Sequence, residues 1–236
     1  MEFPFNRDVF YPVGQLRDFE VELASRRAAD KHFSDNLRSN KLPWAKLRNE
    51  ELMPFALVLN WRKIPSAAEF KIARESAGGP DLYLRNNNVE TNFQLTIADR
   101  KYNNDGGRNY ALQNAALARD GIAWGAGGTS KNGHRGELQS EPKSTDKIDR
   151  EIACKEGLFS ALKNKLSRPM NSDILIVYAR DFAFELIDIG FESFLRSHAE
   201  AWIAENAPNQ EIDVIIADSG SNPAKSIFSL SNRLRF

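Results

Sequence analysis

Two alternating runs of apolar and polar residues, separated by an asparagine-rich turn, constrain this chain more than any other segment. The runs Leu82–Arg85 and Val89–Ile97 alternate with a period of two, and Asn86–Asn88 lies between them. This pattern is typical of two antiparallel β-strands joined by a short turn. A one-residue slip of a half-buried hairpin would move every side chain to the opposite face. We therefore expect a hairpin whose two faces differ in chemistry.

The length of the loop decides which side chains face each other. A loop of two residues, Asn87-Asn88, or of four, 86–89, places Asp81 opposite Gln94. In that register the polar face also carries Tyr83, Arg85, Glu90, Asn92 and Thr96. The apolar face carries Leu82, Leu84, Phe93, Leu95 and Ile97. A three-residue loop would mix the two sets, so we expect Asp81 and Gln94 to converge.

Size and charge exclude several classes of protein. The chain has 236 residues, 42% of them hydrophobic, and its 32 Lys and Arg balance its 32 Asp and Glu. Such a chain can bury one good-sized core, and zero net charge disfavours nonspecific coating of nucleic acid while leaving room for a local basic cleft. No apolar run approaches 18 residues and no signal peptide pattern begins the chain, so we expect a cytoplasmic protein without a membrane partner. Cys154 is the only cysteine, which rules out an internal disulfide and a thiolate zinc site.

The first quarter of the chain predicts a helical N-terminal extension, residues 1–64, packed on an α/β core, residues 65–236. Helical spacing of apolar residues extends over Gly14–Leu37. The apolar run Leu52–Trp61 is interrupted by Pro54, and we interpret it as a connector packed on the core.

The core begins with the form of a capping box, in which Ser66 precedes Glu69 by three residues. This arrangement predicts a helix over Ser66–Arg74 that runs into the hairpin. The remaining expected elements are a short helix at 110–119, a flexible insertion near 121–145, helices at 148–166 and 191–202, and buried strands at 173–179 and 213–218. We therefore expect a mixed sheet covered by helices on both faces.

The polar face of the hairpin suits a hard divalent cation. A carboxylate at the start of one strand, beside polar oxygens on the next, offers the oxygen ligands that Mg²⁺ or Mn²⁺ prefers. We expect Asp81 as the bridging ligand, with the amide oxygen of Gln94 or the main-chain carbonyl of Leu95 beside it. Glu69 would complete the site from the preceding helix, unless it serves only as the capping-box partner of Ser66.

These residues resemble a known motif. Pro80-Asp81 opens the hairpin, Gln94-Leu95-Thr96 follows thirteen residues later, and Glu69 lies upstream. This spacing resembles the motif of the PD-(D/E)XK, or restriction-endonuclease-like, nuclease superfamily. The resemblance implies an αβββαβ core, bound Mg²⁺ or Mn²⁺, and hydrolysis of nucleic-acid phosphodiesters, with DNA favoured over RNA.

The chain departs from that motif at two positions. Gln94 stands where the superfamily usually has an acid, and Thr96 stands where it usually has lysine. Some members accept Gln at the first position, and others take the lysine from the next helix. The lysines available there are Lys155, Lys163 and Lys165, and we rank Lys155 first because it flanks the apolar stripe.

Two alternatives remain open at this point. Glu90 replaces Gln94 as the second carboxylate if the hairpin shifts by a ladder step. A catalytically inactive module that binds nucleic acid or protein would keep the fold and lack the metal. The sequence does not specify the oligomeric state, so homo-oligomers remain open.

Overall fold

The computed structural model describes residues 1–38, 40–74, 79–98, 147–168, 170–179, 190–208, 212–217 and 227–229. Its helices are α1 (Val13–Ala29), α2 (Lys31–Arg38), α3 (Ala45–Leu47), α4 (Met53–Trp61), α6 (Lys147–Leu166) and α7 (Phe191–Asn206), with a π-helical segment, Arg48–Leu52, between α3 and α4. Its strands are β1 (Phe10–Pro12), β2 (Glu69–Ile72), β3 (Leu82–Asn86), β4 (Val89–Ile97), β5 (Ile174–Tyr178), β6 (Asp213–Ala217) and β7 (Ile227–Ser229). The helix expected at 110–119 and the insertion expected near 121–145 lie outside the described residues.

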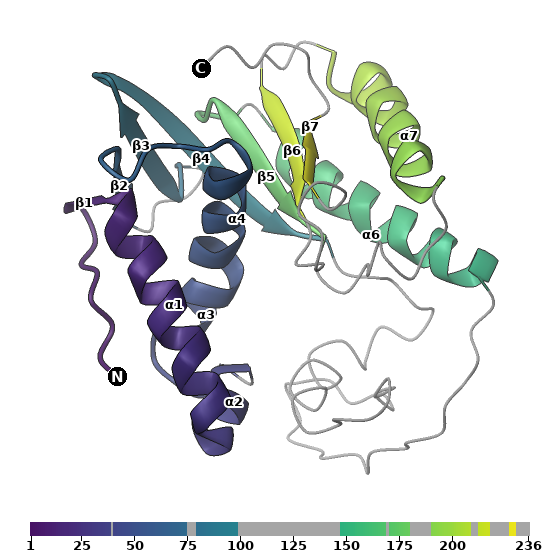
Figure 1. The fold of residues 1–236 in the computed structure, drawn as a ribbon. Coiled ribbons are helices and arrows are strands. Elements are labelled where there is room, and N and C mark those ends of the chain that lie inside the picture. The colour runs from purple at the N-terminus through teal and green to yellow at the C-terminus, as the bar shows by residue number, and fades with distance from the viewer. Residues whose placement is uncertain are drawn as a thin grey trace.

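The seven described strands form one mixed sheet, in which the spatial order follows the order along the chain. β1 to β4 pair in antiparallel fashion, β4, β5 and β6 pair in parallel, and β7 is antiparallel to β6. Helices α1 and α4 lie on one face of the sheet, and α6 and α7 lie on the other (Figure 1). The predicted α/β architecture with helices on both faces is confirmed. None of the described helices has both the length and the apolar character needed to cross a bilayer.

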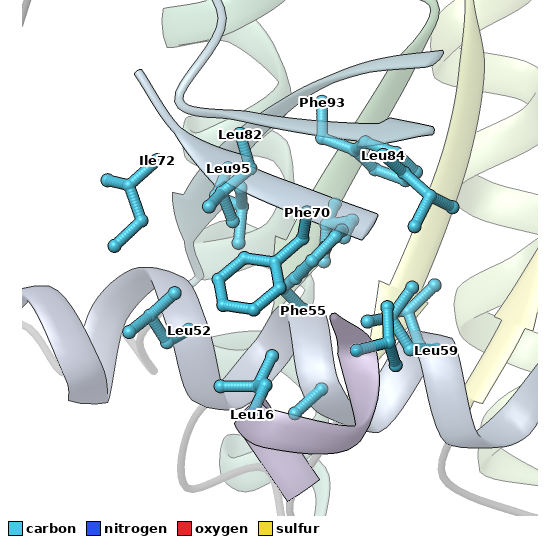
Figure 2. Close-up of a cluster of buried hydrophobic side chains, with 14 of the residues drawn as sticks. Leu16, Leu52, Phe55, Leu59, Phe70, Ile72, Leu82, Leu84, Phe93 and Leu95 are labelled. Atoms are coloured by element: carbon cyan, nitrogen blue, oxygen red, sulfur yellow. The ribbon is translucent and has the colours of Figure 1, made fainter. Parts of the chain in front are cut away.

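Each face of the sheet has its own core. Alternate residues of the parallel strands supply the two cores, which explains why the sequences of β5 and β6 are almost continuously apolar. The first core joins α1 and α4 to β2, β3 and β4, and Figure 2 shows Phe55 of α4 among Phe70, Phe93 and the leucines of these strands. The second core joins α6 and α7 to β5 and β6. Over β2 and β3, the face opposite the first core carries polar side chains.

The hairpin has the predicted two-residue loop. Asn87 and Asn88 have φ angles of 50° and 64°, as a tight turn of this hairpin type requires at both central positions. Leu82 pairs with Phe93 and Arg85 pairs with Glu90, which is the register expected for that loop. The apolar face is buried against α1 and α4, so the predicted division of the two faces is confirmed.

Two predicted elements were wrong. The segment expected to be a helix over Ser66–Arg74 contains strand β2, in which exposure alternates along Glu69–Ile72. The capping-box pattern was misleading, because pairing with β3 and burial of the apolar side chains favour the extended conformation. The run Leu52–Trp61 is helical rather than a connector, since Pro54 lies in the first turn of α4, where its missing N–H costs little.

The N-terminal region contributes to the sheet as well as to its cover. β1 pairs with β2 at one edge, although the sequence pattern predicted no strand there. Arg7, just before β1, forms a parallel bridge with Ile72 at the end of β2. Residues 1–64 are therefore a helical region that also places its first residues beside the hairpin.

Candidate functional site

Asp81 lies where β3 begins and is held by bonds to both neighbouring strands. Its N–H donates to the carbonyl of Phe93 (2.8 Å), and its own carbonyl accepts from the N–H of Ala73 (3.0 Å). One carboxylate oxygen, Oδ2, accepts a hydrogen bond from the N–H of Leu95 at 2.7 Å. These bonds to the residues on either side of Gln94 fix Asp81 next to Gln94.

Gln94 is the buried polar residue of this site. The residue is 8% exposed, and its amide nitrogen Nε2 donates to the carbonyl of Gly79 at 3.2 Å. The amide group is therefore oriented by the segment that leads into β3. A glutamine at this position carries an amide oxygen that can accept or coordinate, and no charge.

Burial dominates the electrostatics of Asp81. It raises the pKa of the Asp81 carboxyl above its usual range, although the N–H of Leu95 and the positive charges of Lys165 and Arg7 act in the opposite direction. A desolvated carboxylate with a raised pKa is typical of sites that bind protons, cations or reacting groups. The same environment identifies Lys165 and Arg7 as the cations that act on Asp81.

Lys165 is the lysine that α6 presents to this site. It belongs to the last turn of α6, and its positive charge acts on the carboxyl of Asp81. Lys155 lies ten residues earlier, about 15 Å along the helix axis. Lys163 is exposed. The structure thus brings Lys165 toward Asp81 instead of Lys155, which the sequence analysis ranked first.

Glu69 does not share this site. It lies on β2 opposite Arg85, with which it forms an ion pair at 3.5 Å, whereas Asp81 is bonded to Ala73. Ala73 is four residues beyond Glu69, or about 13 Å along an extended strand. Glu69 was expected either to bind the metal ion or to cap the helix as partner of Ser66, and both roles depended on a helix over Ser66–Arg74. Because this segment contains strand β2, neither role is available to Glu69.

Glu90 is also engaged away from Asp81. It stands opposite Arg85 in the ladder and accepts a hydrogen bond from that guanidinium at 3.3 Å. The ladder step that would have brought Glu90 to the site does not occur. Thr96, in the position expected for a lysine, is half-buried on β4 and carries no charge.

Arg7 is the site residue that the sequence analysis missed. Its guanidinium donates to the carbonyl of Ala73 at 2.6 Å, and the N–H of Asp8 bonds the carbonyl of Ile72 at 2.8 Å. These bonds hold the N-terminal segment against the end of β2, beside Asp81. No local pattern identifies such a residue, because its partners lie more than sixty positions away along the chain.

The donor set fits only a cation that keeps much of its water. Among the described residues there is no group of three or more His, Cys, Asp or Glu side chains that could hold a metal ion. One carboxylate and one amide oxygen, Asp81 and Gln94, suit Mg²⁺ or Mn²⁺, which bind through one or two carboxylates, retained waters and phosphate oxygens of a substrate. A closed Zn²⁺ or Ca²⁺ cage would need more protein ligands.

Comparison of the chain with protein-family models, with curated proteins and with solved structures finds no match. The chemistry of the site and its position in the sheet therefore carry the functional inference. The site combines one desolvated carboxylate, one oriented amide and two cations. Such a combination can bind a phosphate together with a divalent cation.

Proposed function

We propose that the protein is a metal-dependent nuclease that hydrolyses phosphodiester bonds at Asp81, with DNA favoured as the polymer. The observation that carries the proposal is the position of Asp81. It opens the second strand of an antiparallel three-stranded unit, and Gln94 lies beside it on the third strand. This geometry supports assigning Asp81 and Gln94 to the places of the first and second acidic residues of the PD-(D/E)XK motif that the sequence resembles.

The order of elements supports the same proposal. Among the described elements, α4 is followed by β2, β3 and β4, then by α6 and by β5, which is parallel to β4. This is the αβββαβ order implied by a restriction-endonuclease-like core, with α4 taking the place first expected of a helix at Ser66–Arg74. N-terminal helices α1 and α2 and strand β1 would then be additions to that core.

Each residue has a distinct role in this proposal. A bound Mg²⁺ or Mn²⁺ would supply an activated water and neutralise charge on the phosphate. Asp81 would hold that ion, and the hydrogen bond from the N–H of Leu95 fixes the direction of its carboxylate. Gln94 offers its amide oxygen to the ion or to its water. Lys165 stabilises the negative charge that develops on the phosphate. It thereby takes the role of the motif lysine, whose position is occupied by Thr96 in this chain.

A second function is favoured by the composition of the site. One carboxylate faces two cations, Lys165 and Arg7, and the motif acid is replaced by the neutral Gln94. Positive charges near a metal ion weaken its binding, whereas they strengthen the binding of phosphate. A catalytically inactive module that binds nucleic acid through the same residues is therefore the alternative.

Incubation of plasmid DNA, linear DNA and RNA with Mg²⁺ or Mn²⁺ separates the two functions. The nuclease proposal predicts nicks or fragments from at least one polymer, and loss of cutting in a folded Asp81→Asn protein. Polymers that are retained in a binding assay but stay intact with both ions would favour the inactive module. Equal cutting by the Asp81→Asn protein would refute a role for Asp81 in catalysis.

A further inference from the structure

A row of side chains crosses the polar face of the sheet next to Asp81. In the strand register Phe10 of β1 stands opposite Lys71 of β2, Lys71 stands opposite Tyr83 of β3, and Tyr83 stands opposite Asn92 of β4. Directly opposite residues share a face, and residues two apart on a strand also share it. Tyr83 is two residues from Asp81, so the row passes about 7 Å from the site residue along β3.

Lys71 is held at the centre of this row by two aromatic rings. Its ammonium nitrogen lies 4.8 Å from the ring centroid of Phe10 and 4.1 Å from that of Tyr83. Cation–π contacts on both sides restrict the side chain and fix the charge in place. The three side chains are half-buried, which leaves part of each accessible to a ligand.

Arg85 adds a second cation beside the row, but its charge is already balanced. Its guanidinium carbon lies 3.8 Å from the centroid of Phe10, and the group pairs with Glu69 at 3.5 Å and with Glu90 at 3.3 Å. In the described part of the chain, by contrast, no ion pair involves Lys71. Lys71 is therefore a positively charged group on this face whose charge is not balanced by an ion pair within the described residues.

We propose that the Phe10–Lys71–Tyr83 row binds a single-stranded nucleic acid, with Lys71 contacting the phosphate next to the one at Asp81. The inference rests on the proposed function and names its substrate class. Aromatic rings interleaved with cations, on a sheet face where these side chains are half-buried, are the composition that single-strand binders use. A duplex keeps its base faces stacked inside and would use Lys71 without the rings.

Binding can be measured without cleavage in the Asp81→Asn protein with EDTA, using fluorescence anisotropy of labelled single-stranded DNA, single-stranded RNA and duplex DNA. Lys71→Met keeps the aliphatic stem and removes the charge, Lys71→Arg keeps the charge, and Lys46→Met removes an exposed lysine of α3 as a matched control. We expect weaker single-strand binding by the Lys71→Met protein only. Removal of one phosphate contact should reduce the slope of log affinity against log salt concentration by about 0.7. When the salt is raised from about 50 to about 200 mM, the affinity of the Lys71→Met protein should therefore fall by a factor about 2.6 times smaller than that of the Asp81→Asn protein with Lys71 intact.

Three results would overturn the inference. Lys71→Met could bind like Lys46→Met, Lys71→Arg could fail to retain binding while remaining folded, or duplex DNA could show the same dependence on Lys71 as single strands. The last result would refute the single-strand assignment in particular.

The outcome is also separable from that of the nuclease proposal. If the parent protein cuts a polymer but binding does not depend on Lys71, the inference is refuted and the nuclease proposal is kept. If binding depends on Lys71 but no polymer is cut, the nuclease proposal is refuted and the single-strand binding surface is kept.

Discussion

Asp81 has a structural bond and a proposed catalytic role, and two substitutions separate them. Asp81→Ala removes the oxygen that accepts the hydrogen bond from the N–H of Leu95. Leu95 is only 5% exposed. A buried donor left without a partner costs about 1–3 kcal/mol of unfolding free energy. Asp81→Asn keeps an acceptor oxygen at the same place, so we expect it to cost less than about 1 kcal/mol. Both substitutions should abolish cutting.

Urea unfolding of the two variants and the parent, followed by circular dichroism, measures these differences. Thermal unfolding gives the same differences as changes in Tm. In a chain of this size each kcal/mol of lost stability lowers Tm by about 2–4 °C, so the Asp81→Ala protein should melt about 2–12 °C below the parent protein. The Asp81→Asn protein should melt close to it. Equal destabilisation by both substitutions would show that the charge, and not the hydrogen bond to Leu95, stabilises this corner of the sheet.

The pH dependence of stability tests the electrostatic part of this reasoning. Burial raises the pKa of Asp81 above its usual value of 3.8, so the folded protein holds this proton more tightly than the unfolded chain does. Between the two pKa values the folded state binds more protons, and the contribution of Asp81 to stability falls as pH rises. In EDTA, the stability of the parent relative to Asp81→Asn should therefore be greatest below about pH 4 and should decline above it. A relative stability that rises with pH would contradict a raised pKa.

Three further predictions concern Lys165, the hairpin turn and the first core. Lys165→Met should lower the cleavage rate about 10²–10³-fold. Lys163→Met, which removes an exposed lysine of the same helix, should cut like the parent protein. Equal cleavage rates of the Lys165→Met and Lys163→Met proteins would exclude Lys165 from the site. Asn88→Ala should cost about 1 kcal/mol in urea unfolding because φ is 64° there, and Asn88→Gly should not; equal stabilities would contradict the turn conformation. Phe55→Ala should cost about 3–5 kcal/mol, because this ring is fully buried and packs edge-on against Phe93 at 5.1 Å; a loss below about 1 kcal/mol would argue against the first core as described.

The hairpin and the buried strands were predictable because each is specified locally. Alternation along Leu82–Ile97 sets the two faces, and two asparagines tolerate the positive φ angles that a two-residue loop needs. The runs that became β5 and β6 are apolar on both sides because a core covers each face. These local features favoured the register that brings Asp81 to Gln94, and the observed strand pairing excludes the ladder step that would have brought Glu90 there.

Other features depend on partners that are distant in the sequence. Glu69–Ile72 carries both a capping-box signal and a strand alternation, and only its pairing with β3 decides between them. Similarly, the helical pattern of α6 does not tell which end lies near Asp81, so periodicity could not favour Lys165 over Lys155. Arg7 reaches the site through a bridge to Ile72, which no local pattern encodes.

Mn²⁺ binding by the parent and Asp81→Asn proteins tests the central claim most directly, since it requires no knowledge of the natural polymer sequence. Calorimetric titration in the presence of a short oligonucleotide supplies the phosphate oxygens that complete the coordination of the ion. We predict one Mn²⁺ site in the parent protein that the folded Asp81→Asn protein lacks. Equal binding by both proteins, or no binding by the parent, would contradict a metal-dependent site at Asp81.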